Sequence, residues 1–309
     1  MRDNKEILSS MLKTIAGIEG APVEGAYNIR LNGEGFGRRS TETIQIEPKK
    51  DKPGIDIKVA PFTKHEKVHI PVVLTEEGLN DMVYNDFYIG EGAEVEIVAG
   101  CGIHNSGCQT SEHDGIHRFF VGKNAKVKYV EKHYGEGEGT GDRILNPTTV
   151  VNLGEGAVCE METVQIKGVS STVRVTKAYL EKDASMIMTE RLMTHESQSA
   201  RSEVEIELNG ENARAQIISR SVAKDSSEQL FYPRAIGNAK CAAHVQCDSI
   251  IMDSAKISSV PAITANHCDA AIVHEAAIGR INNEQLIKLQ TLGLTEAEAE
   301  DVIIDDFLK

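Results

Sequence analysis

Residues 121–129 read Val-Gly-Lys-Asn-Ala-Lys-Val-Lys-Tyr, and this phrase returns along most of the chain. Each copy joins a turn of Gly, Asn or Asp to one small residue, which is followed by a strand of alternating apolar and polar residues. An alanine follows the turns at positions 93, 125, 157, 184, 213, 239, 255 and 270, at intervals near fifteen residues or twice that number. In a β-solenoid the turn residue relieves backbone strain, the small residue packs inside the corner, and the apolar residues face a central stack.

The repeat therefore predicts a mainly β protein with an irregular parallel β-helix, or solenoid, over residues 60–281. The hairpin turns of a β-sandwich also recur at intervals and are the alternative. We favour the solenoid because double-length intervals occur and because alanine keeps a fixed place after each turn. Residues 1–59 are expected to form a helical and mixed region, whose first helix carries an apolar face that includes Met11 and Ile15.

The last segment, residues 282–309, has the pattern of two short helices. Asn282 is placed as an N-cap, and Gly293 stands where a helix often ends. Thr295 and Glu298 form the capping box of a second helix. Such a pair can close the open end of a solenoid or bind a partner.

Composition limits the kind of protein this can be. The 309 residues carry a net charge of −14, so we expect no nucleic-acid partner, which would need a clustered basic surface. No run approaches the roughly 20 apolar residues of a membrane span, and we expect no membrane insertion. Six cysteines are too few for a disulfide-stapled secreted domain, and the charged N-terminus lacks an apolar signal core. We therefore expect a cytoplasmic protein with reduced thiols.

The first candidate site lies in the segment Cys-Gly-Ile-His-Asn-Ser-Gly-Cys-Gln-Thr-Ser-Glu-His-Asp-Gly-Ile-His at residues 101–117. Its Cys101, Cys108, His113 and His117 are ligand types that zinc and iron prefer, and soft ligands this dense are uncommon by chance, so a metal site is one interpretation. The spacing matches no fixed zinc-finger pattern. The alternative is a polar loop between two coils whose thiols happen to be close.

The second candidate site joins Cys247 to His274 and Glu275. Cys247 lies in an alternating strand, and the His-Glu pair follows almost two of the short alanine intervals later. If each coil takes about fifteen residues, two coils bring thiol, imidazole and carboxylate together by stacking. Cys241 and Cys268 are near but offset along the coil. The alternative is that Cys247 is simply a small buried apolar residue.

At the C-terminal end the chain resembles a known family. The stretches at residues 246–249, 273–281 and 284–299 resemble the C-terminal half of the SufB/SufD proteins, the scaffold subunits of SUF iron–sulfur cluster assembly. The resemblance implies a right-handed parallel β-helix flanked by helices. It also implies that two such subunits join through their β-helices, here as a homodimer. Each would bind an ABC-type ATPase, SufC, through the C-terminal helices.

The resemblance also implies where the nascent iron–sulfur cluster is built. Carried onto this sequence, the family positions fall on Cys247, His274 and Glu275, near the dimer interface. The His-Glu pair resembles B-type subunits, and the short chain without an N-terminal Cys-x-x-Cys motif suggests a minimal B-like scaffold. It would receive iron and sulfur, the latter from a sulfur donor, and pass the cluster to apo iron–sulfur proteins. The resemblance assigns nothing to the segment at residues 101–117.

The sequence contains no ATPase or hydrolase motif. It has no P-loop, no Gly-x-Ser-x-Gly elbow and no His-Glu-x-x-His helix, so we expect an assembly protein rather than an enzyme. A metal-binding β-helix enzyme and a purely structural interaction module remain the alternatives. Iron and sulfide analysis after anaerobic purification separates the scaffold from the structural module.

Overall fold

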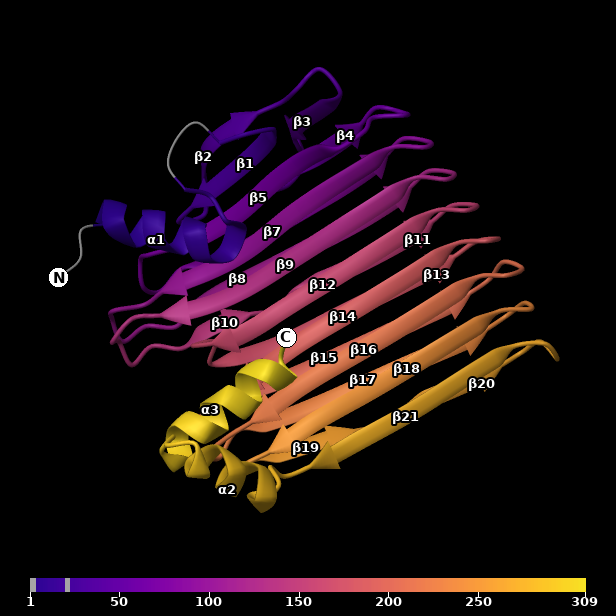
Figure 1. Cartoon of the computed structure of the whole chain (residues 1–309). Helices are drawn as coiled ribbons and strands as arrows, with labels where there is room; N and C mark the ends of the chain where they lie inside the picture. Colours follow the sequence, from indigo (N-terminus) through magenta and orange to yellow (C-terminus); the bar gives the residue numbers. More distant parts are fainter. Residues whose placement is uncertain (1–3, 20–22) are drawn as a thin grey trace.

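The chain folds into two long sheets that stack face to face (Figure 1). The computed structural model describes residues 4–19 and 23–309. Sheet A has the order β2-β1-β5-β7-β9-β12-β14-β16-β18-β21, and sheet B has the order β19-β17-β15-β13-β10-β8-β6-β4-β3, with β11 and β20 beside this path.

The strands of sheet A are β1 (Ala26–Leu31), β2 (Glu34–Arg39), β5 (Glu66–Leu74), β7 (Glu94–His104), β9 (Lys126–Glu136), β12 (Val158–Lys167), β14 (Ser185–Thr194), β16 (Arg214–Ala223), β18 (Ala242–Ile251) and β21 (Ala271–Gly279). Those of sheet B are β3 (Ile44–Pro48), β4 (Gly54–Val59), β6 (Asn80–Ile89), β8 (Ser111–Val121), β10 (Arg143–Leu145), β11 (Thr148–Leu153), β13 (Ser171–Leu180), β15 (Ser199–Leu208), β17 (Glu228–Gly237), β19 (Lys256–Ser259) and β20 (Ala262–Ala265).

The chain alternates between the two sheets, and from β4 onward neighbouring strands within a sheet run parallel. This confirms the predicted β-solenoid, with about eight turns, over the sandwich of hairpins. The predicted coil length is wrong by a factor of two. Lys126 pairs with Glu94 on one side and with Val158 on the other, and Val158 pairs in turn with Ser185. Paired residues are therefore separated by the long alanine interval, so a full turn holds one strand of each sheet and the short interval is half a turn.

The corners explain why the repeat was visible in the sequence. Asn124, Asp183 and Asn212 have φ values of 56°, 56° and 62°, in the left-handed region that Asn, Asp and Gly adopt most easily. The alanines that follow the left-handed residues are fully buried. A larger side chain at these corner positions would not fit, which accounts for the fixed place of alanine.

Proline divides two of the strands in sheet B. Pro147 separates β10 from β11, although both pieces pair with β8 and β13. Pro261 separates β19 from β20, and both pieces pair with β17. Proline has no N–H to donate to the ladder, so each strand is interrupted but keeps its register on either side.

The N-terminal region joins the solenoid. Among residues 1–59, β1 and β4 pair in parallel with β5 and β6, while β2 and β3 add antiparallel hairpins at that end. The predicted helix is present as α1 (Asn4–Ala16), and its apolar face lies on the outer surface of sheet A. A Cβ atom at Gly100 would lie 2.6 Å from the Ile15 carbonyl oxygen, so glycine on β7 allows the close approach of α1.

The two predicted C-terminal helices are also present, as α2 (Asn283–Thr291) and α3 (Glu296–Phe307). Asn282 caps α2, and Thr295 forms the predicted capping box of α3. Ile304 and Leu308 pack on the corner beside β16 and β18, so α3 lies along the ends of the strands (Figure 1). In the described part of the chain, no helix is long and apolar enough to cross a membrane.

Candidate functional site

The last turns of the solenoid place Cys247 and His274 on the same side of sheet A. Backbone pairing sets Val245 opposite His274 and Cys247 opposite Ala276, so both side chains point to the interior, two positions apart on neighbouring strands. Cys247 is 1% exposed. The His274 Nε2 atom is buried and, among the described residues, has no hydrogen-bond partner. Two of the three residues predicted for this site therefore lie on the same face of adjacent strands.

Both groups are held in their neutral forms. Burial raises the pKa of the Cys247 thiol, although hydrogen bonds with Ser259 and Ser249 oppose this. Burial lowers the pKa of His274, against the attraction of the Glu275 carboxylate. A neutral imidazole with a free nitrogen is ready to bind a metal, whereas the thiol must first release its proton.

Glu275 lies on the opposite face of sheet A. It pairs with Gln246, one residue before Cys247, and successive side chains of a strand alternate between faces. Its Oε1 atom is 2.9 Å from His244 Nε2, and both side chains are solvent-accessible. The structure therefore separates the predicted carboxylate from the predicted thiol and imidazole.

The two neighbouring cysteines differ in environment. Cys241 is buried at the corner that precedes β18, and burial raises the pKa of its thiol. Cys268 is exposed in the turn between β20 and β21. Its sulfur lies with ligand atoms of His267 and Asp269 inside a 4.8 Å group. The His267 Nδ1 atom already accepts a hydrogen bond from the Asp269 amide at 3.1 Å, so this turn is partly satisfied by its own backbone.

The segment at residues 101–117 is not the loop that its composition suggested. Cys101 lies on β7, and His113 and His117 lie on β8, with all three side chains buried inside the solenoid. Only Cys108 belongs to the connecting loop, where its thiol is exposed. The Cys108 amide donates to Glu77 at 2.7 Å, which fixes the loop backbone. The interpretation as a loop failed because polar residues here alternate along strands and face inward.

Cys101 and His113 face each other across the interior and carry unusual pKa values. Burial acts to raise the pKa of the Cys101 thiol, but the nearby His113 and His133 imidazoles lower it to about 7. Burial acts to lower the pKa of His113, but Cys101 and the Asp81 carboxylate raise it to about 10. The His113 Nδ1 atom is 3.0 Å from Asp81 Oδ2, which itself is fixed by Arg30. Near pH 7 this pair therefore has strong thiolate–imidazolium character.

His117 serves a different purpose. Its Nδ1 atom lies 2.7 Å from the Tyr129 hydroxyl and its Nε2 atom lies 3.3 Å from Asn85. Burial is the main reason that its pKa falls to about 4, so the ring is neutral. Because both ring nitrogens are engaged, His117 is a satisfied core histidine in this structure.

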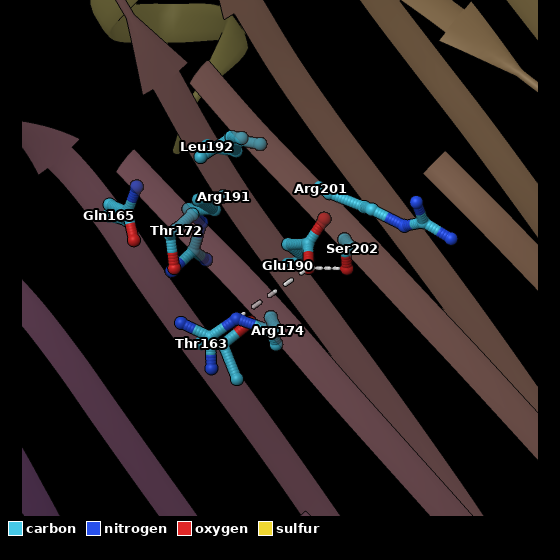
Figure 2. A pocket seen from close by; sticks show the side chains of 10 residues that line it. Thr163, Gln165, Thr172, Arg174, Glu190, Arg191, Leu192, Arg201 and Ser202 are labelled. Atoms are coloured by element: carbon cyan, nitrogen blue, oxygen red, sulfur yellow. Dashed lines mark hydrogen bonds and ion pairs between the residues drawn. The ribbon is translucent and has the colours of Figure 1, made fainter. Parts of the chain in front are cut away.

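Polar side chains continue along the interior from the Cys101 region toward Cys247. Glu131 is ion-paired with Arg174, whose Nε atom lies 4.0 Å from Glu190. Glu190 in turn accepts hydrogen bonds from Ser202 at 2.6 Å and Ser219 at 3.3 Å, as Figure 2 shows for Ser202. Further along, the hydroxyls of Ser221 and Ser249 are 2.9 Å apart. The small cavity in Figure 2 measures only about 10 Å³, room for one water at most, so it is no substrate pocket.

The sequence alone did not identify four residues of this interior row: Asp81, Glu131, His133 and Arg174. A signal for two of them was present. His133 pairs directly with Cys101, and Asp81 pairs directly with His113, so each lies one full turn from a residue that the sequence did single out. Stacking by the full turn rather than the half turn would have found both.

Comparison with known proteins matches residues 76–307 to the family described as SUF system FeS cluster assembly, SufBD core domain. The chain is 29% identical to Iron-sulfur cluster assembly SufBD family protein MJ0034 of Methanocaldococcus jannaschii, over 77% of this chain and 74% of that protein. It is 30% identical to a SufBD family protein of Archaeoglobus fulgidus, over 79% of this chain and 65% of that protein. A third relative, PH0883 of Pyrococcus horikoshii, is 26% identical over 88% of this chain and 83% of its own length.

Proposed function

Because the chain belongs to the SufBD family of iron–sulfur cluster assembly proteins, we propose that it is a scaffold on which a nascent cluster is built and released. Cys247 would supply a thiolate and His274 an imidazole nitrogen at the last closed turn of the solenoid. The observation that carries the proposal is the His274 Nε2 atom, which is buried and unpartnered in the described chain beside the turn that holds Cys247. A buried polar atom without a partner costs about 1–3 kcal/mol, and a metal ligand bond would remove that cost.

The chemistry of these ligands suits a scaffold better than a permanent cluster site. Thiolates bind iron and sulfide strongly, while an imidazole or carboxylate holds iron more weakly than a thiolate does. A cluster held by mixed ligands is therefore easier to transfer to an apo iron–sulfur protein. Glu275 would join the ligands only after its contact with His244 opens, so its contribution is separable from those of Cys247 and His274.

The open end of the solenoid is where we place a second copy of the chain. β21 is the last strand of sheet A, and within the described residues nothing pairs with its outer edge. Val273 and Ile278 on β21 are 55% and 42% exposed, and Ile263 on β20 is 48% exposed. An uncovered strand edge with apolar neighbours invites pairing with another strand. A homodimer formed here would enclose the Cys247 site.

The C-terminal helices are the proposed docking surface for a SufC-like ABC ATPase. Ile287 and Leu292 of the α2 region are 57% and 80% exposed, and Val302 on α3 is 48% exposed. Apolar side chains on a capped helix pair are typical anchors for a partner. ATP binding by that partner would then open or close the neighbouring dimer interface. We place the protein in the cytoplasm, where its six free cysteines stay reduced.

Anaerobic reconstitution with ferrous iron and sulfide tests the cluster site. We expect bound sulfide and sulfide-to-iron charge-transfer absorption in the parent protein, and the loss of both in Cys247→Ser and in His274→Ala. The matched control is Cys159→Ser, because Cys159 is equally buried and has no imidazole against its thiol. If both site variants bind as much iron and sulfide as the control, the site is misplaced. If the parent binds neither, the chain is a structural module rather than a scaffold.

Co-purification tests the ATPase partner. We expect the double variant Ile287→Asp, Leu292→Asp to lose the SufC-like subunit while the β-structure persists. Phe36→Asp is the control, because Phe36 is 59% exposed at the other end of the solenoid. Equal recovery of the ATPase with both proteins would rule out docking at α2.

A further inference from the structure

We propose that the interior of the solenoid holds a second metal site, for one divalent transition-metal ion such as Fe²⁺ or Zn²⁺. The ligands are Cys101 Sγ, His113 Nε2 and His133 Nε2, with Glu131 offering a carboxylate oxygen. This site lies several turns from Cys247 and is independent of the proposed scaffold function.

The fold brings the four residues together from three strands. Cys101 on β7 pairs directly with His133 on β9, while His113 reaches the same region from β8 in the opposite sheet. Cys101 is 5% exposed, His113 2%, His133 3% and Glu131 1%. All four side chains therefore face the interior, away from bulk water.

Both imidazoles present an unused nitrogen toward the thiol. Within the described chain, neither His113 Nε2 nor His133 Nε2 has a hydrogen-bond partner, although both atoms are buried. The Cys101 sulfur lies close enough to both rings for them to lower the pKa of its thiol, so the sulfur is the neighbour that the two imidazoles share. Buried polar atoms in folded proteins nearly always make a hydrogen bond, and neither Nε2 atom makes one to nitrogen or oxygen, so the arrangement favours an ion that binds the thiolate and both nitrogens together.

The groups behind the imidazoles are those of a metal site. Asp81 accepts from His113 Nδ1 at 3.0 Å, the carboxylate–histidine arrangement that orients a ring toward a metal. The His133 Nδ1 atom lies 3.4 Å from Gln165 Oε1, which can accept the Nδ1 proton when Nε2 binds a metal. Arg174, 3.2 Å from the same atom, would then lose this contact and keep its ion pair with Glu131. Two histidines, one cysteine and one carboxylate make a donor set that Zn²⁺ and Fe²⁺ accept.

Glu131 is the natural fourth ligand. Its Oε1 atom lies 3.6 Å from His133 Nε2, a separation close to that of two ligands on one tetrahedral ion. Arg174 and the Tyr129 hydroxyl hold the carboxylate in place. On binding, the thiol proton and any imidazolium proton pass to solvent, and no oxidation or reduction is involved.

The ion would draw the ligands closer than they now lie. Among the described residues, the trio of ligand atoms already within 4.8 Å of one another is that of His267, Cys268 and Asp269, and not that of Cys101. That trio lies in a turn where the Cys268 thiol is exposed, and among the described residues it contains no buried atom that lacks a hydrogen bond. The interior site has the opposite character, since its free nitrogens are buried and its second ring atoms are already anchored.

Cobalt binding tests the site directly. The parent for this experiment is the full chain with Cys247→Ser and Cys268→Ser, so that neither other candidate thiol contributes. After chelation and anaerobic titration with Co²⁺, we expect one bound equivalent with sulfur-to-cobalt charge-transfer absorption and the strong visible bands of a tetrahedral ion. Zn²⁺ and Fe²⁺ should each displace the cobalt.

Variants in that parent decide the ligands. Cys101→Ser should abolish the charge-transfer band, His133→Gln should weaken Co²⁺ binding at least tenfold, and Asp81→Asn should weaken it roughly 10- to 100-fold. Cys159→Ser is the matched control and should bind as the parent does. Unchanged bands in Cys101→Ser, or no thiolate-bound cobalt in the parent, would overturn the proposal. If Cys101→Ser fails to fold, His133→Gln decides: parent-like affinity in that variant also overturns it.

Discussion

Replacing Arg174 with methionine removes the cation at the middle of the interior polar row. Arg174 is 4% exposed and ion-pairs with Glu131, which is 1% exposed. Its Nε atom lies 4.0 Å from Glu190, a longer contact. Methionine keeps much of the volume and fills irregular space well, so the change mainly removes the charge.

The loss of stability in Arg174→Met depends on which carboxylate loses its charged partner. Glu190 keeps its hydrogen bonds from Ser202 and Ser219, whereas Glu131 loses its main counterion and keeps Tyr129 and His133. Removing one member of a buried ion pair costs about 3–5 kcal/mol, since a buried charge is left without compensation. At about 1.5 °C for each kcal/mol in a chain of 309 residues, the melting midpoint should fall by roughly 5–8 °C.

The loss of stability in Arg174→Met should also depend on pH, through the titration of Glu131. In the parent, burial acts to raise the pKa of Glu131, but Arg174 and His133 hold it well below its usual range. That contribution is present above the unfolded pKa, near 4.5, and is lost as pH falls through the folded pKa. Without Arg174 the folded pKa of Glu131 should instead lie above its unfolded value. Lowering the pH from 7.5 to 5 then favours the folded variant, because Glu131 takes up a proton more readily in the folded state. The difference in stability between the parent and Arg174→Met should therefore decrease over this range.

Thermal unfolding at both pH values measures the effect, with two further variants as controls. Arg174→Met, Glu131→Gln removes both charges and should recover at least half of the loss. Arg201→Met removes an arginine whose side chain is 50% exposed beside Glu203, and it should cost less than about 1 kcal/mol. Equal losses in Arg174→Met and Arg201→Met, or a deficit that does not change with pH, would refute the reasoning.

Three shorter predictions test other parts of the fold. Burial acts to raise the pKa of Asp81, but His113 and Arg30 lower it to about 2. The ionised carboxylate therefore contributes about 2 kcal/mol of stability above pH 4, and this contribution is lost toward pH 2. In Asp81→Asn the melting temperature should fall less steeply as the pH is lowered through this range. Gly100→Ala should cost about 1–3 kcal/mol and expose α1 to proteolysis, because its Cβ would meet the backbone of α1, whereas Gly279→Ala, with nothing within 4 Å, should not. Thr295→Ala removes the capping box of α3 and should cost about 1 kcal/mol, seen as faster amide exchange in its first turn.

The fold was predictable because its corners are chemically specific. Residues such as Asn124 and Asp183 have positive φ and are each followed by a buried alanine, so the corners can be recognised in the sequence without knowledge of the packing. The size of the turn was not predictable in the same way. Each strand ends at a corner of its own, whichever sheet it belongs to. The number of corners therefore gives the number of strands but does not show whether a full turn contains one strand or two. Only the pairing of Lys126 with Glu94 and with Val158 shows that a turn contains two strands.

The candidate site was predictable only in part, for a related reason. His274 pairs with Val245, two residues before Cys247 on the same strand. Because side chains alternate between the two faces of a strand, Cys247 and His274 lie on the same face. Glu275 is one residue further and therefore points outward. Around Cys101, a run of Gly, Ser, Asp and His predicts a loop by composition. A strand whose inward positions are polar has the same composition, so the sequence could not separate the two.

A β-solenoid has no need of charges in its interior, since the corner alanines and the aliphatic ladder already form a continuous core. Buried ion pairs often stabilise less than well-packed apolar residues would, so the interior row is costly unless it serves another purpose. The placement of its unpaired atoms indicates that purpose. Four buried histidine nitrogens have no hydrogen-bond partner in the described chain, and one of them, on His69, lies under α1. The other three belong to His113, His133 and His274, each in a strand pairing or facing a buried cysteine. Imidazole nitrogens without a hydrogen bond and thiols on the same interior faces are groups that metal coordination uses, and both proposed sites rest on this arrangement. Because Cys101 and Cys247 lie in different turns, removing either thiol should leave metal binding at the other intact.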